Sequence, residues 1–144
     1  MARLQRGIGG TLILDAEGLV KLSNGNPAAV SRTREAFARG ANVVTAATTL
    51  TEVLRGGPRD AALHRVLRKI RVVAIDETSA RAAGKLLGRT GLSGHRCALD
   101  ALLVTVALNQ NRPAVILTSD AGDISKLAEE PGKSKNERIS VIRI

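Results

Sequence analysis

The stretch Thr11-Leu12-Ile13-Leu14-Asp15 decides how the rest of the sequence is interpreted. A short run of apolar and β-branched residues predicts a strand buried in a parallel sheet, and this run ends abruptly in a carboxylate. In open α/β sheets, ligands bind just beyond the carboxyl ends of the strands. Asp15 therefore stands where chemistry is expected, and its importance depends on whether other acidic residues reach the same edge.

Further apolar runs alternate with helical patterns along the chain. We expect strands over 11–15, 42–46, 72–75 and 115–119, and a short last strand over 139–144 at an edge of the sheet. Between them we expect a helical turn over 18–22, helices over 26–40, 48–56, 58–70, 76–89 and 97–110, a Gly-rich loop over 90–96, and a short helix near 124–128. This order predicts an α/β protein, a three-layer α/β/α sandwich around a central, mainly parallel sheet of four to five strands. Residues 1–10 are expected to form a flexible N-terminal leader, and residues 11–144 a single domain.

The composition limits the classes of partner. The 144 residues carry a net charge of +9, from 22 basic and 13 acidic residues, which favours a polyanion such as nucleic acid over the simpler alternative of solubility alone. Recognition by base stacking has little to work with, because the chain has one Phe and no Trp or Tyr. The single cysteine, Cys97, excludes an internal disulfide and a cysteine-based zinc site. No run approaches the ~20 apolar residues of a membrane span, so we expect no membrane partner and a cytoplasmic protein.

Other acidic residues occupy positions comparable to that of Asp15. Glu52 opens the helix after the second expected strand, and Asp120 ends the fourth, with Asp123 three residues further on. Asp100 lies near the start of the helix that leads into the fourth strand, where it interrupts an apolar face. A carboxylate there is costly to bury unless it is paired, hydrogen-bonded or bound to metal.

Each of these acids also has a purely structural explanation. Asp15 could cap the helix that follows its strand, and the stretch Thr49–Glu52 matches a capping box. Asp100 could interact favourably with the positive end of its own helix. Either Asp120 or Asp123 could cap the last helix, although both doing so is less economical.

In a parallel sheet, however, Asp15, Glu52, Asp100 and Asp120 converge on one edge. Four uncompensated carboxylates would repel one another and raise one another's pKa values, and a divalent cation removes that conflict. An all-oxygen ligand set favours Mg²⁺ or Mn²⁺ over zinc. Outside these four acids, 22 basic residues face nine acidic ones, so positive surface surrounds the acidic pocket. This separation of charge suits metal-dependent cleavage of a phosphodiester.

Four short motifs carry a resemblance to a known family: Leu12–Leu22, Thr51–Leu54, Leu99–Leu103 and Leu117–Ile124, which contain the acids described above. In their order and rough spacing over residues 11–144, the sequence resembles the PIN-domain ribonucleases, and among them the VapC-type toxins of toxin–antitoxin systems. Each motif alone is weak, but four in order on the expected elements are fairly specific.

The resemblance implies an endoribonuclease that depends on Mg²⁺ or Mn²⁺, in which a metal-activated water attacks the phosphorus of RNA. Carried over position by position, it implies Asp15 and Asp100 as direct metal ligands, Glu52 and Asp120 as the rest of the catalytic acidic cluster, and Asp120 and Asp123 as further metal-binding carboxylates. It also implies a homodimer and a small cognate antitoxin protein that fills the active-site groove.

The sequence departs from this family at Glu17, where a small hydroxyl or amide residue is usual, and in its long leader. Arg96 is a further candidate, for contact with a substrate phosphate, while His95 and His64 are weaker ones. Two other functions stay open. A non-catalytic basic nucleic-acid-binding domain would explain the charge but not the gathered acids. A haloacid-dehalogenase-like phosphatase would use Asp15 with an acid two positions later, but would not explain Glu52.

Overall fold

The architecture is a five-stranded, wholly parallel sheet between two layers of helices. The computed structural model describes residues 9–134 and 137–144. The strands are β1 (Thr11–Leu14), β2 (Asn42–Ala46), β3 (Arg71–Val73), β4 (Ala114–Thr118) and β5 (Ser140–Arg143), arranged in the order β3-β2-β1-β4-β5. The expected α/β/α sandwich and the edge position of the last strand are confirmed.

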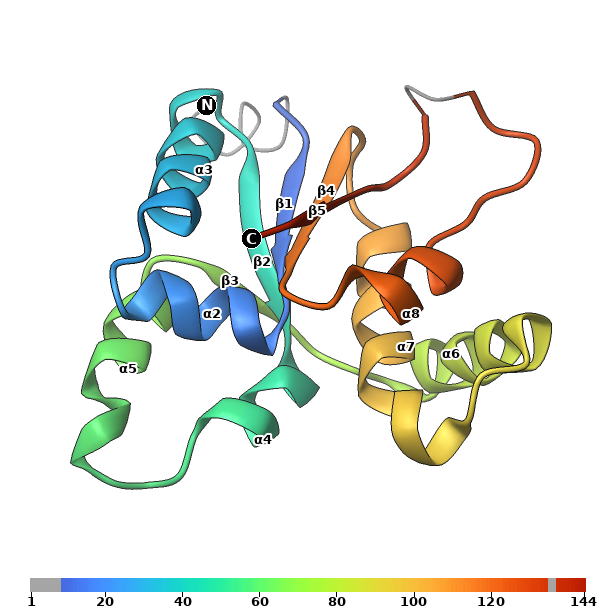
Figure 1. Ribbon diagram of the computed structural model, residues 1–144, viewed down its shortest axis with the longest axis horizontal. Helices are drawn as coiled ribbons and strands as arrows, with labels where there is room; N and C mark the ends of the chain where they lie inside the picture. Colours follow the sequence, from blue (N-terminus) through green and yellow to red (C-terminus); the bar gives the residue numbers. More distant parts are fainter. Residues whose placement is uncertain (1–8, 135–136) are drawn as a thin grey trace.

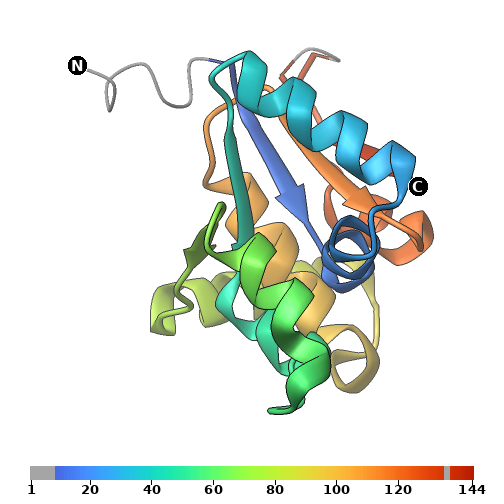
Figure 2. The ribbon, with the colours of Figure 1, turned by 90° about the vertical axis from the view of Figure 1, so that its left-hand side faces the viewer.

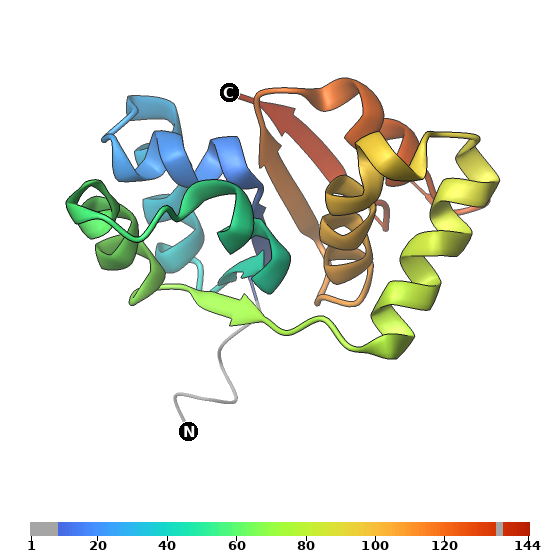
Figure 3. The ribbon, with the colours of Figure 1, turned by 90° about the horizontal axis from the view of Figure 1, so that it is seen from below.

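Helices cover both faces of this sheet (Figure 1). The helices are α2 (Ala16–Ser23), α3 (Pro27–Ala38), α4 (Leu50–Val53), α5 (Ala61–Leu67), α6 (Glu77–Thr90), α7 (Gly94–Leu108) and α8 (Ala121–Leu127), with 3₁₀ turns η1 (Ala47–Thr49) and η2 (Pro58–Asp60). One layer contains α2, α3 and α5, and Figure 2 looks onto this side. The other contains α6, α7 and α8, and seen from below the sheet separates the two layers (Figure 3).

Alternation along β1 joins the sheet to two separate cores. Leu12 and Leu14 face the α2–α3–α5 layer, whereas Ile13 faces the α6–α7–α8 layer. Both layers exclude water, so all four residues of β1 are buried. A central parallel strand covered on both faces is expected to consist of such a continuous apolar run.

The strand order places a topological switch point between β1 and β4. From β1 the chain moves outward through β2 to β3, and then returns to β4 on the other side of β1. Leu14 is paired with Leu117, so the two strands end side by side. Crevices of this kind hold the ligands of open α/β sheets, and Asp15 lies directly at this one.

Several helix boundaries differ from expectation. The helix after β1 runs over eight residues from Ala16, rather than forming one short turn. The most apolar helix begins at Gly94, because the Ser93 hydroxyl accepts the backbone N–H of Arg96 and caps it. The Gly-rich loop is correspondingly shorter than predicted.

The N-terminal boundary also moves. Residues 1–8 of the expected leader lie outside the described residues, but Gly9 and Gly10 already belong to the packed domain. Gly10 has φ +89°, and a Cβ there would collide with the carbonyl oxygen of Pro113. Its own carbonyl accepts the N–H of Asn42, the first residue of β2.

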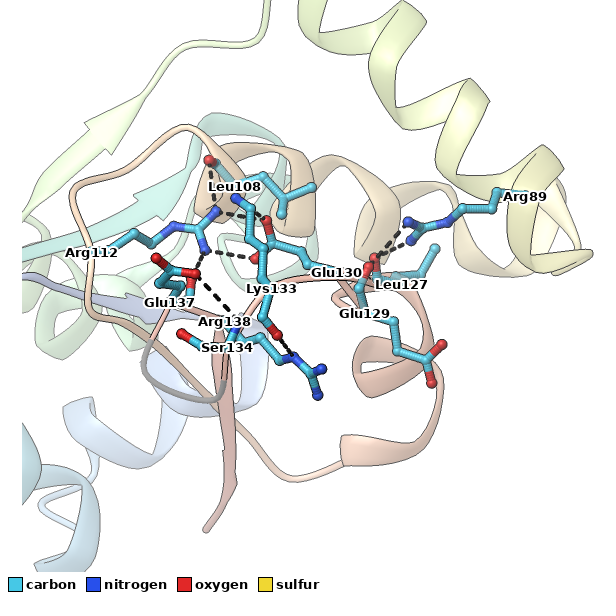
Figure 4. A network of polar contacts seen from close by, with 10 residues as sticks. All are labelled: Arg89, Leu108, Arg112, Leu127, Glu129, Glu130, Lys133, Ser134, Glu137 and Arg138. Atoms are coloured by element: carbon cyan, nitrogen blue, oxygen red, sulfur yellow. Dashed lines mark hydrogen bonds and ion pairs between the residues drawn. The ribbon is translucent and has the colours of Figure 1, made fainter.

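An ion-pair network holds the segment between α8 and β5 (Figure 4). The Arg112 guanidinium lies 2.6 Å from a carboxylate oxygen of Glu130 and donates further bonds to the carbonyls of Leu108 and Glu137. Lys133 also pairs with Glu130, at 2.8 Å. Arg89 of α6 donates to carbonyls at the end of α8. Arginine and lysine side chains therefore connect the elements that meet at this corner of the fold.

Among the described residues, no single helix is both long and apolar enough to cross a bilayer. Only α6 and α7 taken together, across the 120° bend between them, reach that length and composition.

Candidate active site

Five acidic side chains, one of them Glu17 on α2, line one cavity of about 160 Å³ at the carboxyl edge of the sheet. The four predicted acids, Asp15, Glu52, Asp100 and Asp120, all line it, and Glu17 joins them. The four predicted acids come from the ends of β1 and β4, from α4 and from α7, and Glu17 comes from α2. The structure therefore brings together residues that are up to 105 positions apart in the sequence.

Asp15 is both the N-cap of α2 and part of the cavity wall. Its Oδ1 accepts the backbone N–H of Gly18 at 2.7 Å. The preceding residue, Leu14, is fixed from β2, because the buried Thr45 hydroxyl donates to its carbonyl at 2.7 Å. The structural and chemical interpretations of Asp15 are thus compatible, because Asp15 caps α2 through Oδ1 and also lines the cavity.

Burial raises the pKa of Asp15 above its ordinary value, and the nearby Glu17 charge raises it further. Hydrogen bonds from the Thr118 hydroxyl and from backbone N–H groups oppose this shift without cancelling it. The ionised form of Asp15 is therefore destabilised at neutral pH in the absence of a counter-charge.

Glu52 reaches the cavity from the first turn of α4, the helix after β2, as the sequence predicted. The capping box predicted over Thr49–Glu52 is wrong: Thr49 has helical φ and ψ angles, and its side chain makes no capping bond. The 3₁₀ turn η1 precedes α4 directly, so no free helix end remains at Thr49 for Glu52 to serve. Partial burial and then the charges of Asp100 and Asp15 raise the pKa of Glu52.

Asp100 faces the cavity from the second turn of α7. It is half-buried, and burial raises its pKa, followed by the charges of Asp15, Asp123 and Asp120. Its neighbours Leu99 and Leu103 form apolar parts of the same wall. Asp100 is therefore electrostatically coupled to Asp15, Asp120 and Asp123, and it also acts on Glu52.

Asp120 and Asp123, both at the start of α8, make different contacts. Asp120 is the N-cap, because its Oδ1 accepts the N–H of Gly122 at 3.3 Å, and it lines the cavity. Asp123 is not among the lining residues; its Oδ2 accepts a weak hydrogen bond from the Cys97 thiol, 3.6 Å away. The predicted role of Asp123 as a ligand stays a prediction.

Glu17 is the one lining acid that the candidate set left out. It lies in the first turn of α2, is exposed, and acts electrostatically on both Asp15 and Glu52. Its position two residues after the strand-end acid was the signal, but the sequence could not show which way the side chain points.

The basic and histidine candidates lie away from this cavity wall. Arg96 and His95 are exposed in the first turn of α7, rather than in a loop, and neither lines the cavity. His64 is exposed on α5, as expected. A substrate contact by Arg96 stays a prediction.

The chemistry of the cavity suits a hard divalent cation. All its charged donors are carboxylates, the ligands that Mg²⁺ and Mn²⁺ prefer over soft sites. Its volume leaves room for an ion with several waters, each of which takes roughly 30 Å³. The raised pKa values of Asp15, Glu52 and Asp100 are the shifts that a cation would reverse. In the described part of the chain, however, no three His, Cys, Asp or Glu side chains are arranged so that they could hold a metal ion together.

Comparison with known proteins supports the fold rather than a function. No protein-family profile matches the sequence, and no curated protein matches it. Among solved structures, the chain is similar to one in the crystal structure of VapBC2 from Rickettsia felis bound to a DNA fragment from their promoter, with a TM-score of 0.64 and 15% identity over 92% of this chain and 98% of that one. At this identity the likeness extends to the fold: the protein has a PIN-like α/β/α architecture.

Proposed function

We propose that the protein is an endoribonuclease that depends on Mg²⁺ or Mn²⁺. The observation that carries the proposal is the gathering of five carboxylates around one cavity at the β1–β4 switch point, in a chain whose net charge is +9. An acidic cavity in a positively charged protein is suited to bind a divalent cation first. The positive charge of the protein then favours binding of a polyanionic substrate.

The proposed role of each carboxylate follows from its position in the cavity. Asp15 and Asp100 are the proposed direct ligands, because both are half-buried and have carboxylates strained by their surroundings. Glu52 and Asp120 complete the cluster from α4 and from the start of α8. A bound cation would supply charge compensation and Lewis acidity at the phosphodiester.

The acidic residues of the cavity can also take part in proton transfer. Because the pKa values of Asp15, Glu52 and Asp100 are raised, this cluster holds protons to higher pH than free carboxyls do. Glu52, which is exposed, is the member best placed to exchange a proton with an attacking water or a leaving hydroxyl. In the reaction proposed, the water oxygen bonds to phosphorus, one bridging P–O bond breaks, and the leaving oxygen takes a proton.

Cleavage of RNA tests this assignment. We expect a single-stranded RNA to be cut with Mg²⁺ or Mn²⁺, and cleavage to fall by at least about 10²-fold in Asp15→Asn and Asp100→Asn. If calorimetry detects no binding of either cation, the non-catalytic nucleic-acid-binding domain becomes the better account of the positive charge. The phosphatase alternative predicts hydrolysis of small phosphomonoesters instead.

We further propose that the protein is the toxin of a toxin–antitoxin pair, that it forms a homodimer and that a small antitoxin inhibits it. The likeness to a VapBC2 chain supports this assignment. A groove of about 400 Å³ between α2, α3 and α5 offers a surface, with Phe37 45% exposed over it and Arg34 and Lys69 among its lining residues. The Thr33 hydroxyl is buried there with no hydrogen-bond partner among the described residues. An acidic amphipathic segment complements such a groove.

Co-expression tests this partnership. A small protein encoded beside this chain is expected to co-purify with it and to block cleavage, and Phe37→Glu is expected to release it without affecting cleavage by the free chain. If no neighbouring small reading frame relieves toxicity or binds the protein, the toxin assignment is wrong while the nuclease assignment stands. Light scattering of the chain alone tests the homodimer separately.

A further inference from the structure

Positive charge is concentrated in one stretch, residues 55–71, which we call the basic tract. It contains six of the 22 basic residues, Arg55, Arg59, Arg65, Arg68, Lys69 and Arg71, together with His64, but only one of the 13 acids. These 17 residues therefore carry +5, and the other 127 together carry +4. All seven basic and histidine side chains are exposed.

The one acid in the tract does not neutralise its surface. Asp60 is 4% exposed, and its Oδ2 accepts the backbone N–H groups of Gly56 at 2.8 Å and Arg55 at 2.9 Å. These two bonds lower the pKa of Asp60, so its charge is satisfied by the loop that it organises. Within the residues that the structure describes, no ion pair involves a basic residue of the tract.

The tract starts beside the acidic cavity. Arg55 follows Glu52 by three residues, and its guanidinium donates to the carbonyls of Glu52, Thr51 and Leu54 at the end of α4. The loop held by the Asp60 carboxylate then leads into η2 and α5. Helix α5 packs on α2. In Figures 1 and 2 the path from α4 through this loop to α5 is continuous along one side of the molecule.

We infer that the basic tract binds the phosphate backbone of single-stranded RNA and leads it to the acidic cavity. On α5 and its C-cap, His64, Arg65 and Arg68 line one shallow hollow with two apolar neighbours, Ala61 and Leu67. Such a surface offers charge without the large apolar anchors that a protein segment requires. With no aromatic side chain in the tract, the contacts go to phosphates rather than to bases, so binding tolerates sequence and depends steeply on salt. The inference rests on the proposed function for its choice of RNA.

Fluorescence anisotropy with a labelled, unstructured oligoribonucleotide in EDTA tests the tract without any cleavage. The test variant is Arg59→Gln/Arg65→Gln/Arg68→Gln, and the matched control, with the same loss of charge on α3 and α6, is Arg32→Gln/Arg81→Gln/Lys85→Gln. We expect the test variant to bind at least about tenfold more weakly near 0.1 M salt, and its slope of log K against log salt to fall by about 2, that is ~0.7 for each lost phosphate contact. The control is expected to keep the wild-type slope, and so is the triple Arg→Lys variant of the tract. Circular dichroism checks that each variant is folded.

Three results would overturn the inference: no binding of RNA by the wild type, equal losses in test and control variants, or loss of the slope in the Arg→Lys variant. If the wild type cleaves RNA but the tract variants bind it normally, the tract inference fails and the nuclease proposal stands. If the wild type does not cleave but the tract variants lose binding, the reverse holds.

Discussion

The backbone N–H of Gly18 donates to Oδ1 of Asp15 at 2.7 Å, so the first acid of the cavity is also the cap of the helix that leaves it. Gly18 is buried, and a Cβ there would lie 3.0 Å from the carbonyl oxygen of Leu117 and 3.3 Å from Asp15 Oδ1. The start of α2 is thereby pressed against the end of β4. This contact holds Asp15 at the switch point, where the residue lines the cavity.

Replacing Asp15 by Asn separates its charge from its capping role, because Asn also caps helices. A pKa raised in the folded state means that Asp15 contributes stability below its unfolded pKa near 3.8 and loses it as pH rises through the folded pKa. Asp15→Asn is therefore expected to raise the melting temperature in EDTA at pH 7 by a few degrees, with the gain disappearing below about pH 4. Saturating Mn²⁺ should stabilise the wild type more than the variant.

Asp76 provides the matched control for this prediction. It also caps a helix, with Oδ1 accepting the N–H of Ser79 at 2.8 Å, but hydrogen bonds lower its pKa. Asp76→Asn should therefore lower the melting temperature at pH 7, or leave it unchanged, independently of Mn²⁺. Thermal melts of the two variants that respond alike would show that Asp15 is a cap and nothing more.

Glu17 is predicted to strengthen cation binding. Its charge acts on Asp15 and Glu52 across the cavity, so Glu17→Gln removes attraction for a divalent ion. We expect Mn²⁺ affinity measured by calorimetry to fall about threefold to tenfold. Glu77→Gln, a first-turn change on α6, should leave the affinity at the wild-type value. Equal affinities of wild type and Glu17→Gln would place Glu17 outside the binding site.

Cys97 is expected to be unreactive in the folded protein. The thiol is 5% exposed, and burial followed by the charge of Asp123 raises its pKa. Alkylation by iodoacetamide at pH 8 should be about 10² times slower than after unfolding. Because Cys97 is the only cysteine, the count of labelled thiols is direct. Labelling of the native chain at the rate of a small thiol would contradict the contact with Asp123.

The ion pair between Arg112 and Glu130 is expected to make the free energy of unfolding depend on pH in the acidic range. The Arg112 hydrogen bond lowers the pKa of Glu130 to about 2, from 4.5, so the pair stabilises the fold above pH 4.5 and loses this contribution as pH falls towards 2. With side chains only 23% and 12% exposed, Arg112→Gln should lower the free energy of unfolding at pH 7 by about 1–3 kcal/mol.

Urea unfolding measures this contribution against an exposed pair. Arg81→Gln, which removes a pair whose side chains are 75% and 80% exposed, should change stability by less than about 1 kcal/mol. The difference in the free energy of unfolding between wild type and Arg112→Gln should narrow as pH falls towards 2. A gap that stays constant from pH 7 to pH 2 would show that the loss comes from packing rather than from the charge of Glu130.

How much of this could be predicted from the sequence depends on whether a feature is local. The apolar runs located all five strands to within one or two residues, and Asp15 indicated the edge of the sheet at which the acidic residues gather. The pairing of β1 with β4 is not local, because about a hundred residues separate the partners Thr11 and Ala114, yet the alternation of strands and helices was enough to imply convergence.

The errors arose where neighbouring elements change a local pattern. Thr49–Glu52 has the letters of a capping box, but the preceding 3₁₀ turn removes the free helix end that such a box requires. The direction of Glu17 and the contact of Cys97 with Asp123, from α7 to α8, depend on tertiary packing. No periodicity in the sequence encodes them.

Cleavage of single-stranded RNA is the most direct test of the central claim, that the gathered carboxylates form a cation-dependent nuclease site. Wild type, Asp15→Asn, Asp100→Asn and the control Asp76→Asn are compared with Mg²⁺, with Mn²⁺ and in EDTA. We predict cleavage by wild type and Asp76→Asn only when a cation is present, and its loss in Asp15→Asn and Asp100→Asn although both remain folded. Equal cleavage by all four proteins, or cleavage undiminished in EDTA, would contradict the claim.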